Sequence, residues 1–457
     1  MTTSIVPTEI VTLPIDQIKP PKRKLRKHSP LKIDRINHGL EKYGVQTPIL
    51  IDKDYRLIDG GAVLEALQSR GETHAQFIRL THLSSDEVRG LHIHLNKSQE
   101  GSIWIEAELA AEVEELLNFE LTAADLGLET GEVDRLLQSL NNDDDDAIPE
   151  LGDRQSTPPT SEEGNIWLFD QAEHRLAVGD CRDAGLTERL TKGEQATMGF
   201  TDPPYGGRVN GHVGGKGRIK HREFTMASGE MSKEELGKFL SEAMAPVYDH
   251  LRPGGLAYMF MDWRSAALLE REANHAGLET KNWIVWVKPN GGMGSLYRSR
   301  HEFILLFRKP GDKSINNVQL GKFGRNRTNV WEYEGANSFG ATRDDLANHP
   351  TPKPVQMIED AILDATDRGD TVLDLFGGGG TTMIAAQRCG RRALLCEIDP
   401  IYADVTIERY QRIFGIEAVL EETGETYSEV MRRRQAPATT PRHRVRHRAR
   451  VRVAEIA

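Results

Sequence analysis

An apolar run that ends in four consecutive glycines constrains the fold of this chain more than any other feature. Residues 371–376 have the pattern of a buried strand, Gly377–Gly380 follow at once, and a helical pattern runs on to Cys389. Four residues without a Cβ let a ligand lie against bare backbone, where the N–H groups at a helix start converge. A second strand, 391–396, ends at Glu397, which is placed to accept both hydroxyls of a ribose. This unit predicts a site for an adenosine-containing cofactor, and alone it does not exclude a nicotinamide nucleotide.

A second motif, Asp202-Pro203-Pro204-Tyr205, follows the apolar residues 198–201 and narrows the chemistry. An exocyclic amine of a base is a poor nucleophile, because its lone pair is delocalised into the ring. If the Asp202 carboxylate and the Pro203 carbonyl accept its two hydrogens, the nitrogen becomes more tetrahedral and its lone pair points at a methyl donor. Two prolines fix φ and hold that carbonyl, and Tyr205 offers a flat face for an extruded base. The motif therefore predicts amine methylation, with a plain Pro-Pro turn as the alternative.

With these two motifs in place, residues 165–414 resemble the DNA amino-methyltransferases, which are S-adenosylmethionine-dependent N6-adenine and N4-cytosine enzymes. The tetrapeptide precedes the glycine turn, which is the motif order of the family's β group. Residues 349–354 look like its His-x-Thr-x-Lys-Pro element, in which Lys353 would meet the cofactor's carboxylate. Gly379 stands where the family often has Ser, and Pro352 where it often has Gln.

The resemblance implies roles for individual residues. The catalytic residues that it implies are Asp202, Pro203, Pro204 and Tyr205. The cofactor-binding residues that the resemblance and the glycine turn imply are Asp180, Lys353, Asp374, Phe376, Gly377, Gly378, Gly379, Gly380, Thr381, Thr382 and Glu397. Asp180 would face the adenine edge of S-adenosylmethionine, with helix capping as its alternative role. Asp rather than Ser at the first position of the tetrapeptide is the family's pattern for adenine.

The order of the motifs predicts a permuted sheet. Because only one helix, 402–414, follows Glu397, the strand beside residues 391–396 must come from residues 174–179. The further strands are expected at 196–201, 255–261, 282–287 and 302–307, with helices at 186–190 and 232–250. The predicted fold is a doubly wound α/β, Rossmann-like methyltransferase sheet whose ligands lie at the carboxyl ends of the strands.

Two segments are expected to contact double-stranded DNA. Residues 206–220 combine glycines with basic residues, and residues 309–348 interleave basic and aromatic residues. The DNA-binding residues expected in these segments are Arg208, Lys216, Arg218, Lys322, Arg325 and Arg327. A solvated loop is the alternative for the second segment.

The first hundred residues resemble the ParB/sulfiredoxin-like nucleotide-binding domain, a separate α+β unit. The matching pieces are residues 47–51, 57–60, 66–67 and 71. Gly61, Ala62 and Val63 stand where the family carries His and Arg residues that hold a triphosphate. No cysteine precedes Cys181, which excludes sulfiredoxin chemistry. We expect this unit to contact DNA or a protein partner, and nucleotide binding stays open.

Composition and motifs together divide the chain into five expected parts. The expected parts are 1–100 (ParB-like), 101–140 (helical extension), 141–164 (acidic and polar linker), 165–422 (methyltransferase) and 423–457 (basic disordered tail). Between Arg432 and Arg452 there are nine arginines and no acidic residue, so the net charge of −11 does not argue against a nucleic-acid partner. This tail is either a phosphate-binding arm or a terminus with no specific role.

The sequence argues against several classes of protein. The chain has no apolar run long enough to cross a membrane and no secretory signal at its start, which favours a cytoplasmic protein without a membrane partner. Three cysteines without CxxC spacing argue against disulfides and structural zinc, and no metal site is expected.

The predicted function is transfer of a methyl group from S-adenosylmethionine to N6 of adenine in DNA, as in restriction-modification systems, although no endonuclease motif is present. The alternatives are an N4-cytosine enzyme, an RNA or protein amino-methyltransferase, a nicotinamide dehydrogenase, and a partition-type DNA-binding protein with a vestigial methyltransferase domain. A homodimer stays open.

Overall fold

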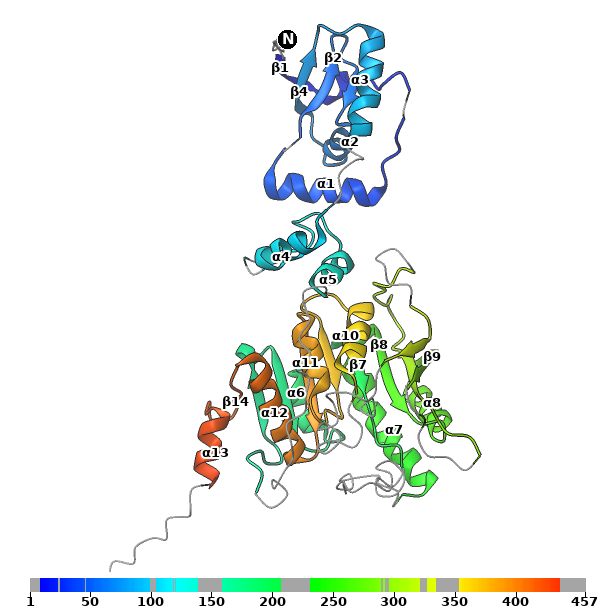
Figure 1. Cartoon of the computed structure of the whole chain (residues 1–457), viewed down its shortest axis with the longest axis vertical. Helices are drawn as coiled ribbons and strands as arrows, with labels where there is room; N and C mark the ends of the chain where they lie inside the picture. The colour runs from blue at the N-terminus through cyan, green and yellow to red at the C-terminus, as the bar shows by residue number, and fades with distance from the viewer. Residues whose placement is uncertain are drawn as a thin grey trace, which may run out of the picture.

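The computed structural model describes residues 9–23, 25–45, 47–98, 104–117, 119, 121–138, 158–206, 231–288, 291, 296–320, 327–333 and 353–435. Figure 1 shows three parts along the longest axis: a small α+β part, a helix pair, and a large part built on one wide sheet.

The small part is a four-stranded sheet in the order β1-β4-β2-β3, with helices packed against it. Its elements are β1 (Glu9–Pro14), η1 (Ile15–Gln17), α1 (Pro30–Tyr43), β2 (Ile49–Asp52), β3 (Leu57–Asp59), α2 (Gly61–Ser69), β4 (His74–Leu80) and α3 (Ser85–Ser98). Strands β2 and β3 pair antiparallel as a hairpin. Ile49, Ile51 and Phe77 are buried between sheet and helices and form the centre of a separate small core.

The helix pair, α4 (Glu106–Leu117) and α5 (Thr130–Gln138), lies between the other two parts (Figure 1). The two helices pack on each other through buried apolar residues, among them Val113 and Val133. Towards the large part, the carboxylate of Asp134 accepts hydrogen bonds of 2.8 and 2.9 Å from Arg391, and both side chains are buried. The helix pair is therefore bound to the large part by a buried ion pair, and it lies beneath the small part.

The large sheet has ten strands in the order β11-β9-β10-β8-β7-β12-β13-β6-β5-β14. Its strands are β5 (Ile166–Phe169), β6 (His174–Val178), β7 (Ala196–Thr201), β8 (Leu251–Met261), β9 (Glu279–Val287), β10 (His301–Arg308), β11 (Val330–Glu332), β12 (Thr371–Asp374), β13 (Arg392–Glu397) and β14 (Val419–Leu420). The central run β8-β7-β12-β13-β6 is parallel, and β5 and β10 pair antiparallel at its two sides.

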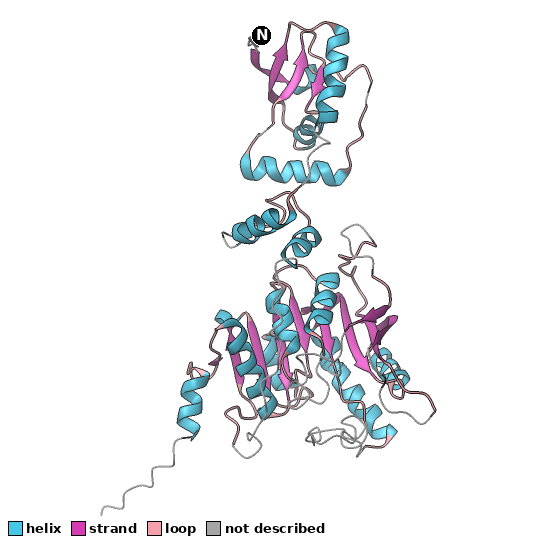
Figure 2. Cartoon of the chain, in the orientation of Figure 1, coloured by secondary structure: helices cyan, strands magenta, loops and turns pink. Residues whose placement is uncertain are grey.

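Helices cover both faces of this sheet (Figures 1 and 2). One face packs against α10 (Val355–Ala365), α11 (Thr381–Arg388) and α12 (Pro400–Phe414), and the other against α6 (Ala184–Thr191), α7 (Lys233–His250) and α8 (Ala266–His275). Two large hydrophobic clusters, one on each face, make the core. This is the mixed, largely parallel α/β sheet that the sequence predicted.

The predicted permutation is confirmed, because β6 pairs in parallel with β13 although more than two hundred residues separate them in the chain. The expected strands and helices are present. β7 has the predicted ends, whereas the ends of others are shifted; for example, β8 begins at Leu251 rather than at residue 255. The sequence patterns did not predict β5, α8, α10, β11 or β14. These elements extend the edges of the sheet and complete its helical layers.

The structure corrects one boundary of the predicted linker, 141–164, and one boundary of the predicted disordered tail, 423–457. Thr160 and Ser161, assigned to the linker, are buried, and their backbone N–H groups donate to the Asp404 carboxylate. Helix α13 (Tyr427–Gln435), assigned to the basic tail, packs Tyr427 and Val430 into the core. The composition of both segments concealed a few residues that pack on the sheet. Residues 139–157 and 436–457 lie outside the described residues.

Across the residues that the structure describes, no helix combines the length and the apolar character that a membrane crossing requires.

Candidate active site

The candidate site lies where the parallel strands β7 and β12 end side by side, with Val372 of β12 opposite Met198 of β7. At this edge the buried carboxylate of Asp374 ties three segments together. It accepts hydrogen bonds from the Thr201 hydroxyl (3.1 Å), the Thr382 hydroxyl (2.6 Å) and the Phe376 N–H (3.1 Å). Burial raises the pKa of Asp374 to about 6. Asp374 thus anchors the glycine turn to the strand that precedes the tetrapeptide.

The glycine turn is closely packed at its last position. Gly380 is the N-cap of α11 with φ of 76°, and a Cβ there would come within 2.6 Å of the Thr406 side chain. Glycine is therefore required by both backbone conformation and space. From the other side, Arg409 donates to the Gly379 carbonyl at 2.9 Å and to the Thr381 hydroxyl at 3.0 Å.

Glu397, at the end of β13, faces the same turn. One carboxylate oxygen accepts the Gly378 N–H at 2.7 Å, and the other accepts the Asp399 N–H at 2.8 Å. Burial raises the pKa of Glu397 to about 7. Since each carboxylate oxygen has a second lone pair, Glu397 keeps acceptor capacity for hydroxyl groups of a ligand.

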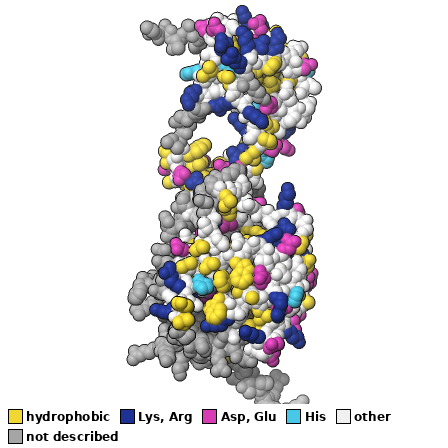
Figure 3. Space-filling model, turned by 90° about the vertical axis from the view of Figure 1, so that its right-hand side faces the viewer, with side chains coloured by type: hydrophobic (Ala, Val, Ile, Leu, Met, Phe, Trp, Pro, Cys, Tyr) yellow, Lys and Arg dark blue, Asp and Glu magenta, His cyan; other side chains and the backbone are white. Residues whose placement is uncertain are grey.

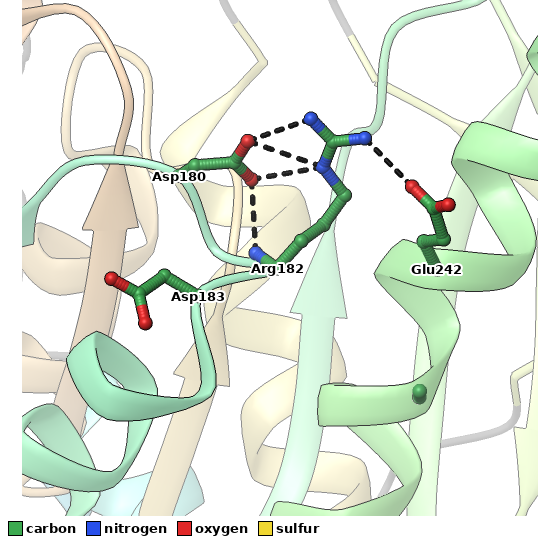
Figure 4. A pocket seen from close by; sticks show the side chains of 5 residues that line it. Asp180, Arg182, Asp183 and Glu242 are labelled. Carbon is green, nitrogen blue, oxygen red and sulfur yellow. Dashed lines mark hydrogen bonds and ion pairs between the residues drawn. The ribbon is translucent and has the colours of Figure 1, made fainter.

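A cavity of about 510 Å³ opens beside the end of β6, lined by Asp180, Arg182, Asp183, Glu242 and Ala245 (Figure 4). The guanidinium of Arg182 forks onto the Asp180 carboxylate and reaches Glu242 on α7 at 2.8 Å. The hydrogen bond from Arg182 lowers the pKa of Asp180. Arg182 also lies over the Phe239 ring, which contacts Phe376 edge to face. The cavity is therefore connected to the glycine turn by packed side chains.

The tetrapeptide forms a charged cluster at the end of β7. The Tyr205 hydroxyl donates to Oδ1 of Asp202 at 2.7 Å, and Nζ of Lys353 lies 2.9 Å from Oδ2. Lys353 also lies 3.1 Å from Oε2 of Glu302 on β10. The backbone of the motif is fixed as well, because Ser265 donates to the Tyr205 carbonyl at 3.1 Å. The structure thus brings together Asp202, Tyr205 and Lys353, three residues that the sequence singled out.

Aromatic rings surround the Lys353 ammonium. Nζ lies 4.7 Å from the ring centre of Phe260, 5.6 Å from that of Tyr205 and 5.8 Å from that of Trp286. The side chain of Lys353 is only 8% exposed, against 26% for Asp202. Electron-rich faces stabilise a buried cation, and the same faces offer stacking surface to a flat ring.

The charges of this cluster depend on one another. Burial raises the pKa of Asp202 even though Lys353 opposes the shift. Burial would lower the pKa of Lys353, but Asp202 and Glu302 outweigh it and the pKa rises. Burial, Asp202 and Glu302 all raise the pKa of Tyr205. Tyr205 is therefore a hydrogen-bond donor at neutral pH, and Lys353 is a cation.

Sequence reasoning missed two members of this cluster, Glu302 and Lys288. Lys288 follows β9 and contacts Oε1 of Glu302. The available signal was a glutamate at the start of an otherwise apolar strand, where a buried acid requires a cationic partner.

Of the six residues predicted to contact DNA, the structure describes Arg327. Arg208, Lys216, Arg218, Lys322 and Arg325 lie outside the described residues. Arg327 is described, and it pairs internally with Asp360 and Asp364 while lying over the Trp331 ring. A DNA contact by Arg327 stays a prediction, and the structure adds a role in holding β11 against α10. Among the described residues, no group of three His, Cys, Asp or Glu side chains has an arrangement suited to a metal ion.

Comparisons with known proteins find similarity to DNA methylases. Residues 196–408 match the N6/N4 methyltransferase family model, described as DNA methylase. The Type II methyltransferase M.HpaI of Haemophilus parainfluenzae is 27% identical over 237 residues, which cover 47% of this chain and 68% of the relative. A DNA modification methylase of Thermus thermophilus, TTHA0409, solved in complex with S-adenosyl-L-methionine, is 26% identical; the match covers 52% of this chain and 93% of that chain with a TM-score of 0.38.

A further similarity is weak and partial. A C-terminally truncated chromosome-partitioning protein ParB from Caulobacter crescentus matches with 19% identity and a TM-score of 0.26, over 30% of this chain and 82% of that chain. Likeness at this level carries no argument, so the ParB-like character of the first hundred residues stays a prediction. The family model instead matches residues 196–408, the part of the chain that holds the cluster and that is similar to the N6/N4 DNA methylases, whose methyl donor is S-adenosylmethionine.

Proposed function

We propose that this chain transfers a methyl group from S-adenosylmethionine to the N6 amine of adenine in double-stranded DNA, after extrusion of the target base. The observation that carries the proposal is the position of the Asp202 carboxylate. It lies at the carboxyl end of β7, next to the glycine turn that follows the neighbouring strand β12, and Tyr205 and Lys353 hold it in place.

The residues around the turn fit S-adenosylmethionine. Glu397 would accept the ribose hydroxyls, and Asp180 would accept the adenine amine beside a cavity of about 510 Å³. That volume is in the range of small-molecule sites. Lys353, whose ammonium lies beside the tetrapeptide, would meet the carboxylate of the methionine end. The middle of the cofactor, between these two ends, would lie against the bare backbone of the glycine turn, residues 377–380.

When bound, S-adenosylmethionine would supply a methyl group carried on a sulfonium, and the sulfur would keep the electron pair of the S–C bond. Asp202 and the Pro203 carbonyl accept the two amine hydrogens, which directs the nitrogen lone pair at that methyl group. As the N–C bond forms, the nitrogen loses one proton, and the Asp202 carboxylate takes it. Burial raises the pKa of Asp202, which makes this carboxylate a better proton acceptor than an exposed aspartate.

DNA contacts are proposed for two parts of the chain. In sequence, residues 206–220 and 309–348 lie within the methyltransferase part and the arginine-rich tail follows it, and all three segments carry basic side chains. In the small part, the segment before α1 exposes basic residues, and Figure 3 shows Lys and Arg side chains gathered on this part. The exposed, described residues of that segment are Lys19, Lys22, Arg23, Arg26 and Lys27. Contacts of this kind are made with phosphates and weaken steeply with salt.

Replacement of Asp202 tests the proposal. Asp202→Ala removes the acceptor of the amine hydrogens, so we expect methyl incorporation into DNA to be lost while S-adenosylmethionine and DNA still bind. Binding is measured by calorimetry and by fluorescence anisotropy, and incorporation with radiolabelled cofactor. Asp370→Asn changes an aspartate at the opposite end of β12, where its carboxylate accepts the Asp367 N–H, and should leave incorporation unchanged. Wild-type incorporation in the Asp202→Ala protein would refute the assigned role.

A further inference from the structure

Glu302 occupies a position that the proposed reaction does not yet use. It lies on β10, a strand paired on both sides by β8 and β9, and its side chain is 10% exposed. Oε1 contacts Nζ of Lys288, and Oε2 lies 3.1 Å from Nζ of Lys353 and 3.2 Å from the Tyr205 hydroxyl. Glu302 therefore touches two residues that also touch Asp202.

The charges show why an acid is stable at this place. Burial would raise the pKa of Glu302, but Lys353 and Lys288 outweigh it and hold the pKa at about 2. Glu302 is thus ionised at neutral pH, and its negative charge contributes to the raised pKa of Asp202. Two carboxylates and two ammonium groups balance in charge around the Tyr205 hydroxyl.

We propose that Glu302 is a positioning residue for methyl transfer: it holds the Lys353 ammonium beside Asp202 and, as a second anion, keeps Asp202 basic enough to take the proton from the amine. This role rests on the proposed function. The relevant groups come from four segments: Asp202 and Tyr205 after β7, Glu302 on β10, Lys288 after β9, and Lys353 before α10. Asp374 on β12 is a further neighbouring charge, coupled to Asp202.

The geometry explains why two anions are useful. Lys353 bridges Asp202 at 2.9 Å and Glu302 at 3.1 Å, so it keeps one counter-ion when the other carboxylate turns to the target amine. Without Glu302, Asp202 would be the carboxylate that remains beside the Lys353 ammonium, and it would carry the whole of that ion pair. A carboxylate paired with a cation in this way is a poorer base.

The direct test follows the Asp202 carboxyl in the ligand-free protein. Aspartate is labelled with ¹³C at Cγ, and the Asp202 signal is assigned by its loss in Asp202→Asn. We expect its titration midpoint to move to lower pH in Glu302→Gln, because a negative charge beside it is removed. Glu279→Gln is the matched control, since Glu279 lies on β9 of the same sheet and pairs with Arg308 and Lys281 outside the cluster. That variant should leave the midpoint unchanged.

Kinetics provide the second measurement. In Glu302→Gln we expect kcat to fall by at least about tenfold, the effect of losing one charge-assisted contact in the reacting state. The affinity for S-adenosylmethionine should change less than kcat does. The double variant Glu302→Gln/Lys288→Gln removes one charge of each sign and guards against misfolding; its kcat should stay low.

An unmoved Asp202 midpoint together with a wild-type kcat in Glu302→Gln would overturn the role. So would recovery of a wild-type kcat in the double variant, because Glu302 would then serve only to neutralise Lys288. A wild-type protein without methyltransferase activity would instead count against the proposed function, and the ligand-free titration would still decide whether Glu302 tunes Asp202.

Discussion

Individual side chains at the carboxyl edge of the sheet combine burial with charge, and this combination sets their chemistry. Asp202, Asp374 and Glu397 are carboxylates whose pKa is raised by burial. Each is also held by hydrogen bonds from neighbouring residues. Their types and positions followed from the sequence, because strand-end acids after apolar runs are recognisable. Glu302 and Lys288 did not follow, since their contact depends on the antiparallel pairing of β9 and β10, which no local pattern specifies.

The raised pKa of Glu397 predicts a pH-dependent stability. In the folded state it binds a proton up to about pH 7, whereas the unfolded chain releases it near pH 4.5. Because the native state then holds more protons, stability from this residue falls as pH rises from about 4.5 to 7. In Glu397→Gln this loss should disappear. Urea denaturation of both proteins between pH 5.5 and 7.5 measures the difference, and parallel pH profiles would contradict the assignment.

At the scale of elements, strands and helices with strong local patterns could be predicted, including the strand–glycine turn–helix unit and the permuted partner strand β6. Elements outside the motifs were missed. β11 has three residues and is defined by its pairing with β9, and β14 has two residues and pairs only with β5 among the named strands. Such edge strands exist because of neighbours far along the chain, so composition cannot reveal them. Helix α13 was hidden by its run of arginines, although Tyr427 and Val430 pack into the core.

The glycine turn yields a prediction at this scale. Gly380→Ala adds a Cβ 2.6 Å from the Thr406 side chain at a φ of 76°. Gly369→Ala is the matched control, because its φ is 81° and a Cβ there meets nothing within 4 Å. Backbone strain alone should cost about 1 kcal/mol in both variants. Gly380→Ala should cost about 1–3 kcal/mol more, as overpacking does. Equal losses of unfolding free energy in urea would show that the turn tolerates the extra atom.

The whole molecule is held together by contacts of unequal strength. Between the helix pair and the large part lies the buried pair Asp134–Arg391, and Gln138 adds a hydrogen bond of 2.9 Å to Asp360. Between the small part and the helix pair lie the more exposed contacts of Arg35 with Glu129 and Glu132. The helix pair is therefore expected to move with the large part rather than with the small part.

Two substitutions test this difference. Asp134→Ala leaves the Arg391 guanidinium buried without its carboxylate, and we expect it to lower the unfolding free energy by about 3–5 kcal/mol. Arg35→Ala removes two half-exposed ion pairs, with Glu129 and Glu132, and should cost about 1 kcal/mol. Urea denaturation gives the free energies, and limited proteolysis shows where the chain opens. A larger loss in Arg35→Ala than in Asp134→Ala would reverse the proposed order of the two junctions.

The central claim is amine methylation of adenine in DNA, and mass analysis of nucleosides tests it most directly. Unmethylated double-stranded DNA is incubated with the full chain and isotopically labelled S-adenosylmethionine, then digested to nucleosides. The account predicts labelled N6-methyladenine with the wild-type chain and none with Asp202→Ala. Labelled N4-methylcytosine would keep the amine chemistry and contradict the choice of base. Absence of label from DNA, in a protein that binds S-adenosylmethionine, would contradict the account as a whole.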